Sequence, residues 1–370
     1  MILLTILVFI FILGLLVFVH ELGHFIMAKR AGMKVEEFGF GFPPRIFGIK
    51  KGETTYSINW IPLGGFVRIL GEDGGSEDPR SFGQGKFWPR LSVLLAGVVM
   101  NFILGWFLIF LGFLVIGSPI EVGEGADVGR AQISNPQLSV IAVQAGAPAD
   151  VAGFRPGDVI LSVDGQKFES VDELISYTKS RAGQNVTYEL KRGRDIFDRS
   201  ATPRVNPPEG QGPVGFAPAL IAKATYPLAD ALKYSFASFY GRVAGIFMAF
   251  GMLFKGLFTS GKLIEGLSGP VGIAVLTRDF TRLGIVYLTQ FAAVLSINLG
   301  IINAFPFPAL DGGRVLFLII EKIRGAKSLK WERIANAVGF LLLMLLMVAI
   351  TFRDVNRFSE QFKRLFERMF

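Results

Sequence analysis

The sequence predicts an α-helical integral membrane protein with about four transmembrane helices, a membrane-associated β-hairpin or sheet loop and an inserted α+β domain. Three observations support this: 51% of the 370 residues are hydrophobic, 18% are charged, and four long segments carry no charge. A helix needs about 20 apolar residues to cross a bilayer. This composition excludes a disordered chain and argues against an ordinary soluble domain.

The four charge-free segments set the expected transmembrane helices, which we place within residues 1–30, 91–118, 283–313 and 334–352. The first of them also has the apolar character of a signal peptide. It lacks the basic start and the small-residue cleavage site of such a peptide. A retained transmembrane helix is therefore favoured over a cleaved signal.

Basic residues predict the orientation, because Lys and Arg in short loops are held on the cytoplasmic side. The loop at 31–90 and its flank from residue 25 carry ten Lys and Arg, and the loop at 314–333 carries six. No basic residue precedes the first helix. We expect both loops inside and both termini outside, although the basic C-terminal tail at 353–370 fits this less well.

A separate α+β domain is expected outside, at residues 119–222. The segment 117–225 has eleven basic and thirteen acidic residues, a net charge of −2, whereas the whole chain has +8. Alternating apolar residues and Gly turns predict short strands and one helix. We place the strands at 138–143, 158–163 and 186–190, and the helix at 171–181.

Two further segments are apolar but interrupted by charges. The longest charge-free piece of 226–282 has 12 residues, which predicts amphipathic helices in the membrane interface, with re-entry into the bilayer as the alternative. In 31–90, the β-rich runs 54–61 and 65–70 predict a hairpin, with 34–40 as a third strand. This sheet either lines a cavity in the membrane or is an ordinary cytoplasmic hairpin.

The chain has two histidines, which stand four residues apart in His-Glu-Leu-Gly-His at positions 20–24. On a helix this spacing puts His20 and His24 on one face, where both bind one zinc ion while Glu21 reaches its water. Cysteine is absent, which excludes a disulfide framework, a thiolate metal site and a cysteine nucleophile. The pattern predicts a zinc site, with a pair of helix-capping interfacial histidines as the alternative.

A catalytic zinc site needs a third protein ligand besides two histidines. Without further His or Cys it must be Asp or Glu, and Asp311 stands out because it follows the third charge-free segment. Pro306 and Pro308 break the helix just before it. The predicted topology places His24 and Asp311 near the same inner face. A helix-capping role for Asp311 is the alternative.

Several motifs occur together along the chain. They are the His-Glu-x-x-His end of the first span, Asn-x-x-Pro-x-Pro-x-Leu-Asp-Gly-Gly at 303–313, Pro-Leu-Gly-Gly at 62–65, and Leu-Ser-Gly-Pro-Val-Gly-Ile-Ala at 267–274. This combination resembles the site-2 protease family of intramembrane zinc metalloproteases, and more narrowly its bacterial sigma-E regulator protease branch. The segment 146–160 resembles a PDZ domain of the bacterial protease type, with a spacer domain as the alternative. The best-known members have two such domains in tandem.

The resemblance assigns roles to individual residues. It implies one zinc ion per chain, with the ligands His20, His24 and Asp311. It implies that Glu21 is the catalytic acid and base and that Asn303 lies beside the substrate. It also implies a strand that holds the unwound substrate, for which we name Gly65, Phe66, Val67 and Arg68.

The expected partners follow from the same resemblance. Substrates would be single-span membrane proteins, such as anti-sigma factors or signal-peptide remnants, cleaved near the cytoplasmic face of a bacterial inner membrane. A peptide or ectodomain remnant at the PDZ-like domain is a further expected partner, and nucleic acid is not expected. An inactive membrane scaffold and a metal transporter are the alternatives. Retention of Glu21 argues against the first, and the scarcity of polar residues in the spans argues against the second.

Overall fold

The computed structural model describes residues 2–72, 76–123, 128–193, 195–260, 268–325 and 329–357. They form two compact units. The first is built from the described parts of Met1–Leu108, Phe239–Arg278 and Phe291–Phe370, and the second from those of Ile109–Ser238 and Asp279–Gln290. Most of the predicted C-terminal tail, at 358–370, lies outside the described residues. So do residues 261–267 of the predicted segment 226–282 and residues 326–328 of the predicted loop 314–333.

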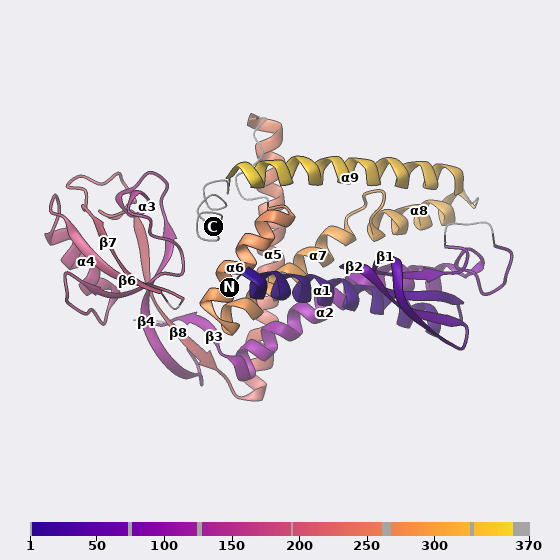
Figure 1. Cartoon of the computed structure of the whole chain (residues 1–370), viewed down its shortest axis with the longest axis horizontal. Helices are drawn as coiled ribbons and strands as arrows, with labels where there is room; N and C mark the ends of the chain where they lie inside the picture. Colours follow the sequence, from indigo (N-terminus) through magenta and orange to yellow (C-terminus); the bar gives the residue numbers. More distant parts are fainter. Residues whose placement is uncertain are drawn as a thin grey trace. The chain divides into compact units, whose positions relative to one another are not determined.

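Helices contain more of the described residues than strands do (Figure 1). They are α1 (Ile2–Arg30), α2 (Phe87–Leu111), α3 (Pro148–Val151), α4 (Val171–Ser180), α5 (Leu228–Ser260), α6 (Pro270–Leu283), α7 (Ile285–Ala304), α8 (Asp311–Arg324) and α9 (Leu329–Arg357). A 3₁₀ turn, η1 (Phe82–Gln84), precedes α2, and a π-helical turn, η2 (Gly112–Ile116), extends it.

Among the described residues, five helices are long and apolar enough to cross a membrane. The stretches are Leu3–Arg30, Phe87–Ile116, Leu228–Leu253, Ile285–Ala304 and Trp331–Arg357. Four of them coincide with the predicted spans. The fifth lies in α5, in the segment expected to hold interfacial helices, so the predicted number of about four is not confirmed. Lys233 and Arg242 interrupt its apolar sequence, and long basic side chains of this kind can extend toward an interface.

α1 and α2 pack closely and run in opposite directions. His20 of α1 faces Asn101 of α2, and His24, one turn later, faces Val93. Gly23 permits the close approach, because a β-carbon there would stand 2.5 Å from the backbone oxygen of Ala96. Small residues allow helix backbones to approach in this way.

Glycines also allow α2 and α7 to pack closely. A β-carbon at Gly105 of α2 would stand 2.7 Å from Ile297 of α7, and one at Gly300 of α7 would stand 2.9 Å from Phe102 of α2. The residue numbers rise along one helix as they fall along the other, so α2 and α7 are antiparallel. α1 and α7 consequently run in the same direction, and each leads toward one part of the metal centre described below.

The first unit contains an antiparallel sheet of two long, bent strands, β1 (Val35–Lys51) and β2 (Thr54–Ile69). Glu37 is paired with Thr55 on one side and with Arg68 on the other. The first half of β1 therefore lies between the two halves of β2. The far edge of the last part of β2 has no partner strand among the described residues.

This pairing corrects the predicted hairpin between 54–61 and 65–70. The two runs do not pair with each other, because the predicted third strand, at 34–40, lies between them. The connecting residues cross over the end of that strand, and Gly64 there has a φ of 133°, which favours glycine. Periodicity had identified the strands but not their order.

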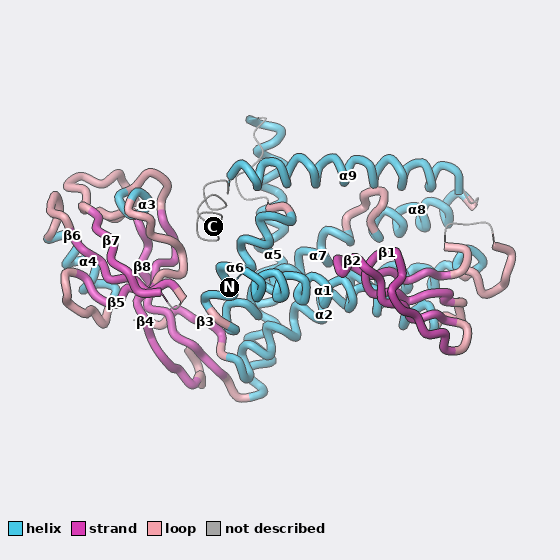
Figure 2. Tube along the Cα trace, in the orientation of Figure 1, coloured by secondary structure: helices cyan, strands magenta, loops and turns pink. Residues whose placement is uncertain are grey.

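The second unit contains a six-stranded antiparallel sheet in the order β3-β8-β4-β5-β6-β7 (Figure 2). Its strands are β3 (Ser118–Glu121), β4 (Gln132–Val143), β5 (Val159–Val163), β6 (Val186–Arg192), β7 (Asp195–Ala201) and β8 (Phe216–Thr225). The predicted strands at 158–163 and 186–190 and the predicted helix at 171–181 are confirmed within one or two residues, whereas the strand predicted at 138–143 begins six residues earlier, at Gln132. Buried apolar side chains from β4, β5, β6 and α4 form its core.

A buried ion pair fixes the turn before β5. Asp158 is fully buried and accepts hydrogen bonds from Nε and Nη2 of Arg192 at 2.6 and 2.7 Å. The same Nη2 donates to the backbone oxygen of Gly153 at 2.9 Å. Gly153 and Gly157 have φ values of 84° and 91°, which explains the glycines of this Gly-x-x-x-Gly-Asp turn.

Candidate metal centre

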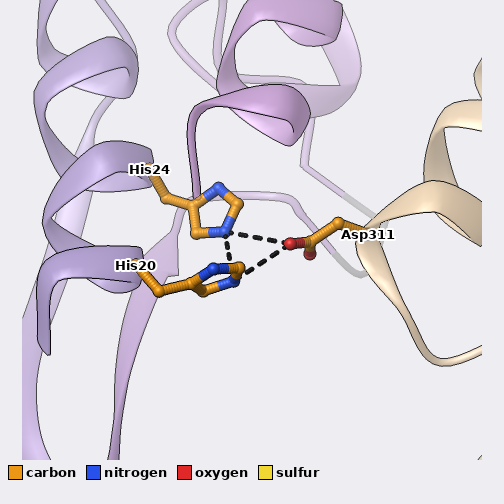
Figure 3. Close-up of side chains that lie close together, drawn as sticks. All are labelled: His20, His24 and Asp311. Atoms are coloured by element: carbon orange, nitrogen blue, oxygen red, sulfur yellow. Dashed lines mark hydrogen bonds and ion pairs between the residues drawn. The ribbon is translucent and has the colours of Figure 1, made fainter. Parts of the chain in front are cut away.

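The imidazoles of His20 and His24 and the carboxylate of Asp311 converge on one point (Figure 3). Nε2 of His20 lies 3.0 Å from Oδ2 of Asp311, and Nε2 of His24 lies 3.4 Å from the same oxygen. The two Nε2 atoms are 3.2 Å apart. Residues almost 300 positions apart in the sequence thus present three ligand atoms to each other.

These three distances fit a tetrahedral zinc ion. Ligands bound at 2.0–2.1 Å in tetrahedral geometry are about 3.3 Å from one another. The observed separations of 3.0, 3.2 and 3.4 Å lie around that value. Two imidazole nitrogens and one carboxylate oxygen are also the donor set of known catalytic zinc sites, which leave the fourth position open.

Contacts with α2 orient both imidazoles through their Nδ1 atoms. The Nδ1 atom of His24 lies 2.8 Å from the backbone oxygen of Val93, so Nδ1–H donates there and Nε2 keeps its lone pair. Nδ1 of His20 lies 3.0 Å from the side-chain amide of Asn101. Gly97 stands between these contacts, directly against both rings.

The loop before α8 positions Asp311. α8 begins at Asp311, and Leu310 precedes it in an extended conformation. The two following glycines are packed on the loop backbone: a β-carbon at Gly312 would stand 2.3 Å from the oxygen of Ala304. This close packing places the first turn of α8 beside the histidines, with the carboxylate of Asp311 directed at them.

A cavity of about 330 Å³ opens beside the three ligand atoms. It is lined by His20, Glu21, His24, Phe66, Val67, Arg68, Ile69, Glu72, Val93, Leu94, Asp311 and Arg314. The last part of β2, which includes three of the predicted substrate-binding residues, therefore forms one wall. The fourth, Gly65, is buried, and a β-carbon there would stand 3.4 Å from Cγ of Glu21. Asn303, near the end of α7, is half-buried and is not among these lining residues.

The sequence motifs assign no role to Glu72 or Arg314. Both line the cavity, and Nη1 of Arg314 forms an ion pair with Oε1 of Glu72. Arg314 follows Asp311 by three residues, so helical spacing alone places it on the same face of α8. Glu72 lies three residues after the end of β2 and has no comparable pattern in the sequence.

Glu37 holds the sheet together from inside. Its carboxylate accepts hydrogen bonds of 2.7 Å from Ser57 and from Arg45, and Arg68 lies 3.6 Å away. Burial would raise the pKa of Glu37, but these hydrogen bonds and the two guanidinium charges outweigh it and hold the pKa below its usual value. An ionised Glu37 therefore ties both halves of β2 to the strand between them.

Comparison with known proteins gives one consistent result. Residues 8–346 match the model of the family described as Peptidase family M50. Regulator of sigma-W protease RasP from Bacillus subtilis is 32% identical, over 95% of this chain and 98% of the relative. Zinc metalloprotease RasP from Geobacillus kaustophilus is 29% identical, over 96% and 98%. A crystal structure of a PDZ domain from an SdrC-like protein of Listeria innocua is 30% identical over 22% of this chain and 92% of that domain, with a TM-score of 0.20.

Proposed function

The chain belongs to peptidase family M50, the site-2 type of zinc metalloprotease, and we propose that His20, His24 and Asp311 hold its zinc ion, one per chain. The protein is a multi-pass membrane protein and a zinc metalloprotease. The observation that carries the proposed ligand set is the convergence of three ligand atoms at separations of 3.0, 3.2 and 3.4 Å.

Glu21 is the proposed catalytic acid and base. It follows His20 on α1 and lines the same cavity as the three ligand atoms. A zinc ion bound there supplies Lewis acidity and lowers the pKa of its water toward 7. The carboxylate of Glu21 takes the proton of the attacking water and returns it to the leaving amide nitrogen.

The last part of β2 is the proposed substrate strand. Phe66, Val67 and Arg68 line the cavity, and the edge they form has no partner strand among the described residues. A transmembrane substrate must unwind before its amides can be attacked, and an edge strand satisfies the backbone of an extended segment. Asn303 stays a predicted substrate contact, which requires the substrate to extend beyond this cavity.

The proposed substrates are single-span membrane proteins and membrane-bound remnants of larger ones. The relative from Bacillus subtilis is named as a regulator of sigma-W, which makes anti-sigma factors the first class to test. The proposed location is a bacterial inner membrane, with the metal centre toward the cytoplasmic face. The basic loops at 31–90 and 314–333 support this orientation.

The six-stranded domain is proposed to be a single PDZ-like domain on the outer side. Between α4 and the start of β8 it has a cavity of about 770 Å³, lined by Leu174, Thr178 and Phe216 among others. The outward edge of β8 is paired with β3 from Ile221 onward, and Val122 donates a backbone hydrogen bond of 2.8 Å to Leu220. The first residues of β8 therefore offer an edge to an extended peptide, such as an ectodomain remnant.

Replacement of the proposed base tests this function. The variant Glu21→Gln keeps the shape of the side chain but cannot accept the proton, so we expect cleavage of a model single-span substrate to be lost with the zinc content intact. Glu53→Gln, at an exposed carboxylate of the β1–β2 turn, is the matched control and should cleave normally. Undiminished cleavage by Glu21→Gln would contradict the assignment.

Membrane proteomics can identify the substrates. Single-span fragments that accumulate in cells carrying Glu21→Gln, but not in wild type, are the expected result. If no such fragment accumulates under any stress condition, the proposed substrate class is wrong.

A further inference from the structure

Asn101 is a fully buried amide in the middle of α2. Its Nδ2 atom lies 3.0 Å from Nδ1 of His20, and its Oδ1 atom has no hydrogen-bond partner among the described residues. Its backbone oxygen accepts a hydrogen bond of 2.7 Å from Oγ of Ser296 on α7. A buried amide with an unpaired oxygen is costly in an apolar span, so helix packing alone does not account for it.

The chemistry of a histidine ligand explains this position. An imidazole that binds a metal through Nε2 carries its proton on Nδ1, and that N–H requires an acceptor. For His24 the acceptor is the backbone oxygen of Val93. For His20, Nδ1 contacts the carboxamide of Asn101.

A carboxamide suits both tautomers of His20 because one end donates and the other accepts. As the structure stands, Nδ1 of His20 accepts a hydrogen bond from Nδ2 of Asn101, and Nε2 of His20 lies 3.0 Å from Oδ2 of Asp311. A half-turn of the amide presents Oδ1 to the ring instead. Nδ1–H then donates to Asn101, and Nε2 has its lone pair free for a metal.

We propose that Asn101 is a positioning residue of the metal centre, whose carboxamide holds His20 in the tautomer that binds zinc through Nε2. This role rests on the proposed ligand set of His20, His24 and Asp311. Asn101 is not among the residues that line the cavity beside the three ligand atoms. It acts through the imidazole ring of His20, and its contact with Nδ1 also fixes the orientation of that ring.

Zinc affinity of the full-length chain in detergent tests this role without measuring activity. Competition with a chromogenic chelator should show that Asn101→Leu, which has a similar size but no acceptor, binds zinc about 10 to 100 times more weakly than wild type. Asn101→Asp should keep the wild-type affinity or exceed it, because a carboxylate accepts the same proton. Ser296→Ala removes the neighbouring hydrogen bond to the Asn101 backbone and should leave the affinity unchanged.

Each other outcome decides against the proposal. Equal affinity of wild type and Asn101→Leu would overturn it, and so would an equal loss in Asn101→Leu and Ser296→Ala, which would indicate helix packing. If Asn101→Leu does not fold, Asn101→Ala replaces it, with the same expected loss and the same rescue by Asn101→Asp. Failure of the wild-type chain to bind zinc would instead refute the ligand set itself, together with this role.

Discussion

Gly97 of α2 lies against the imidazole of His24 so closely that a β-carbon there would stand 2.4 Å from Nε2. The same β-carbon would stand 2.7 Å from Nε2 of His20. One helix thus supplies the space in which two side chains of another helix meet a third ligand.

Replacement of Gly97 by alanine should therefore strongly weaken zinc binding. The added methyl group must displace at least one imidazole, and we expect zinc affinity to fall by more than about 100-fold, beyond the usual effect of an outer contact. Gly245→Ala in α5 is the control, since no atom lies within 4 Å of a β-carbon there. Zinc content measured after purification checks this, and full occupancy of Gly97→Ala would contradict it.

The ion pair between Arg314 and Glu72 should stabilise the first unit. Their side chains are 33% and 20% exposed, so removal of one partner leaves a half-buried charge, and we expect Arg314→Met to cost about 1–2 kcal/mol. The double variant Arg314→Met/Glu72→Gln should lose less stability than the sum of the losses of the two single variants. A double-mutant cycle measured by thermal unfolding tests this.

The more exposed pair of Arg80 and Glu53 provides the control for that cycle. Solvent screens such charges, and the corresponding cycle of Arg80→Met and Glu53→Gln should show little coupling. Equal coupling in both cycles would mean that the position beside the cavity adds nothing.

Glu37 should make the stability of the β1–β2 sheet depend on pH. Its folded-state pKa lies below the unfolded value, so its stabilisation is present above the unfolded pKa and is lost as the pH falls through the folded one. Glu37→Gln should lower the local free energy of opening of β1 and β2 by about 1 kcal/mol at neutral pH. Amide hydrogen exchange in both strands should then be faster.

The difference between wild type and Glu37→Gln should vanish in acid. Exchange measured at several pH values in detergent, with Glu53→Gln as the exposed control, checks this. A difference that persisted at low pH would show that shape, and not charge, holds the two halves of β2 in place.

The buried pair of Asp158 and Arg192 should carry much of the stability of the six-stranded domain. Arg192→Met leaves a fully buried carboxylate without its counter-charge, which costs about 3–5 kcal/mol. Resistance of the full-length chain to added protease should fall, and zinc content should not change. Arg130→Met is the control, since Arg130 is 73% exposed in its pair with Asp230. Equal protease resistance of wild type, Arg192→Met and Arg130→Met would contradict the prediction.

The three residues of the candidate metal centre could be selected from the sequence because rare residues and helical spacing single them out. The chain has two histidines, four residues apart, and one acidic residue directly after the prolines of a charge-free segment. Gly97 and Asn101 could not be predicted in the same way. Their roles arise where α1 and α2 touch, and no local pattern encodes which turn of one helix meets which turn of another. The one available signal was a strongly polar Asn inside an apolar segment.

The β loop shows a second limit. Alternation and turn residues identified all three strand segments at 34–40, 54–61 and 65–70, because these depend on neighbours in the chain. The order of the strands depends instead on side chains brought together from a distance, above all Glu37 with Ser57 and Arg45. For α5, the charge-free criterion considered only the 12 residues between Arg242 and Lys255, whereas the helix continues through Lys233, Arg242 and Lys255.

The free edge of β2 also has a consequence for self-association. An exposed strand edge pairs with any extended chain, including the same edge of a second molecule, and so invites aggregation. Here β2 packs against α1, and Gly65 lies beside Glu21. Arg68 adds a charge to the edge, as many proteins do to discourage such pairing. A flexible single strand can enter beside α1 more easily than the rigid sheet of a second molecule can. The position of α1 therefore discourages self-association while the edge of β2 stays open to a substrate.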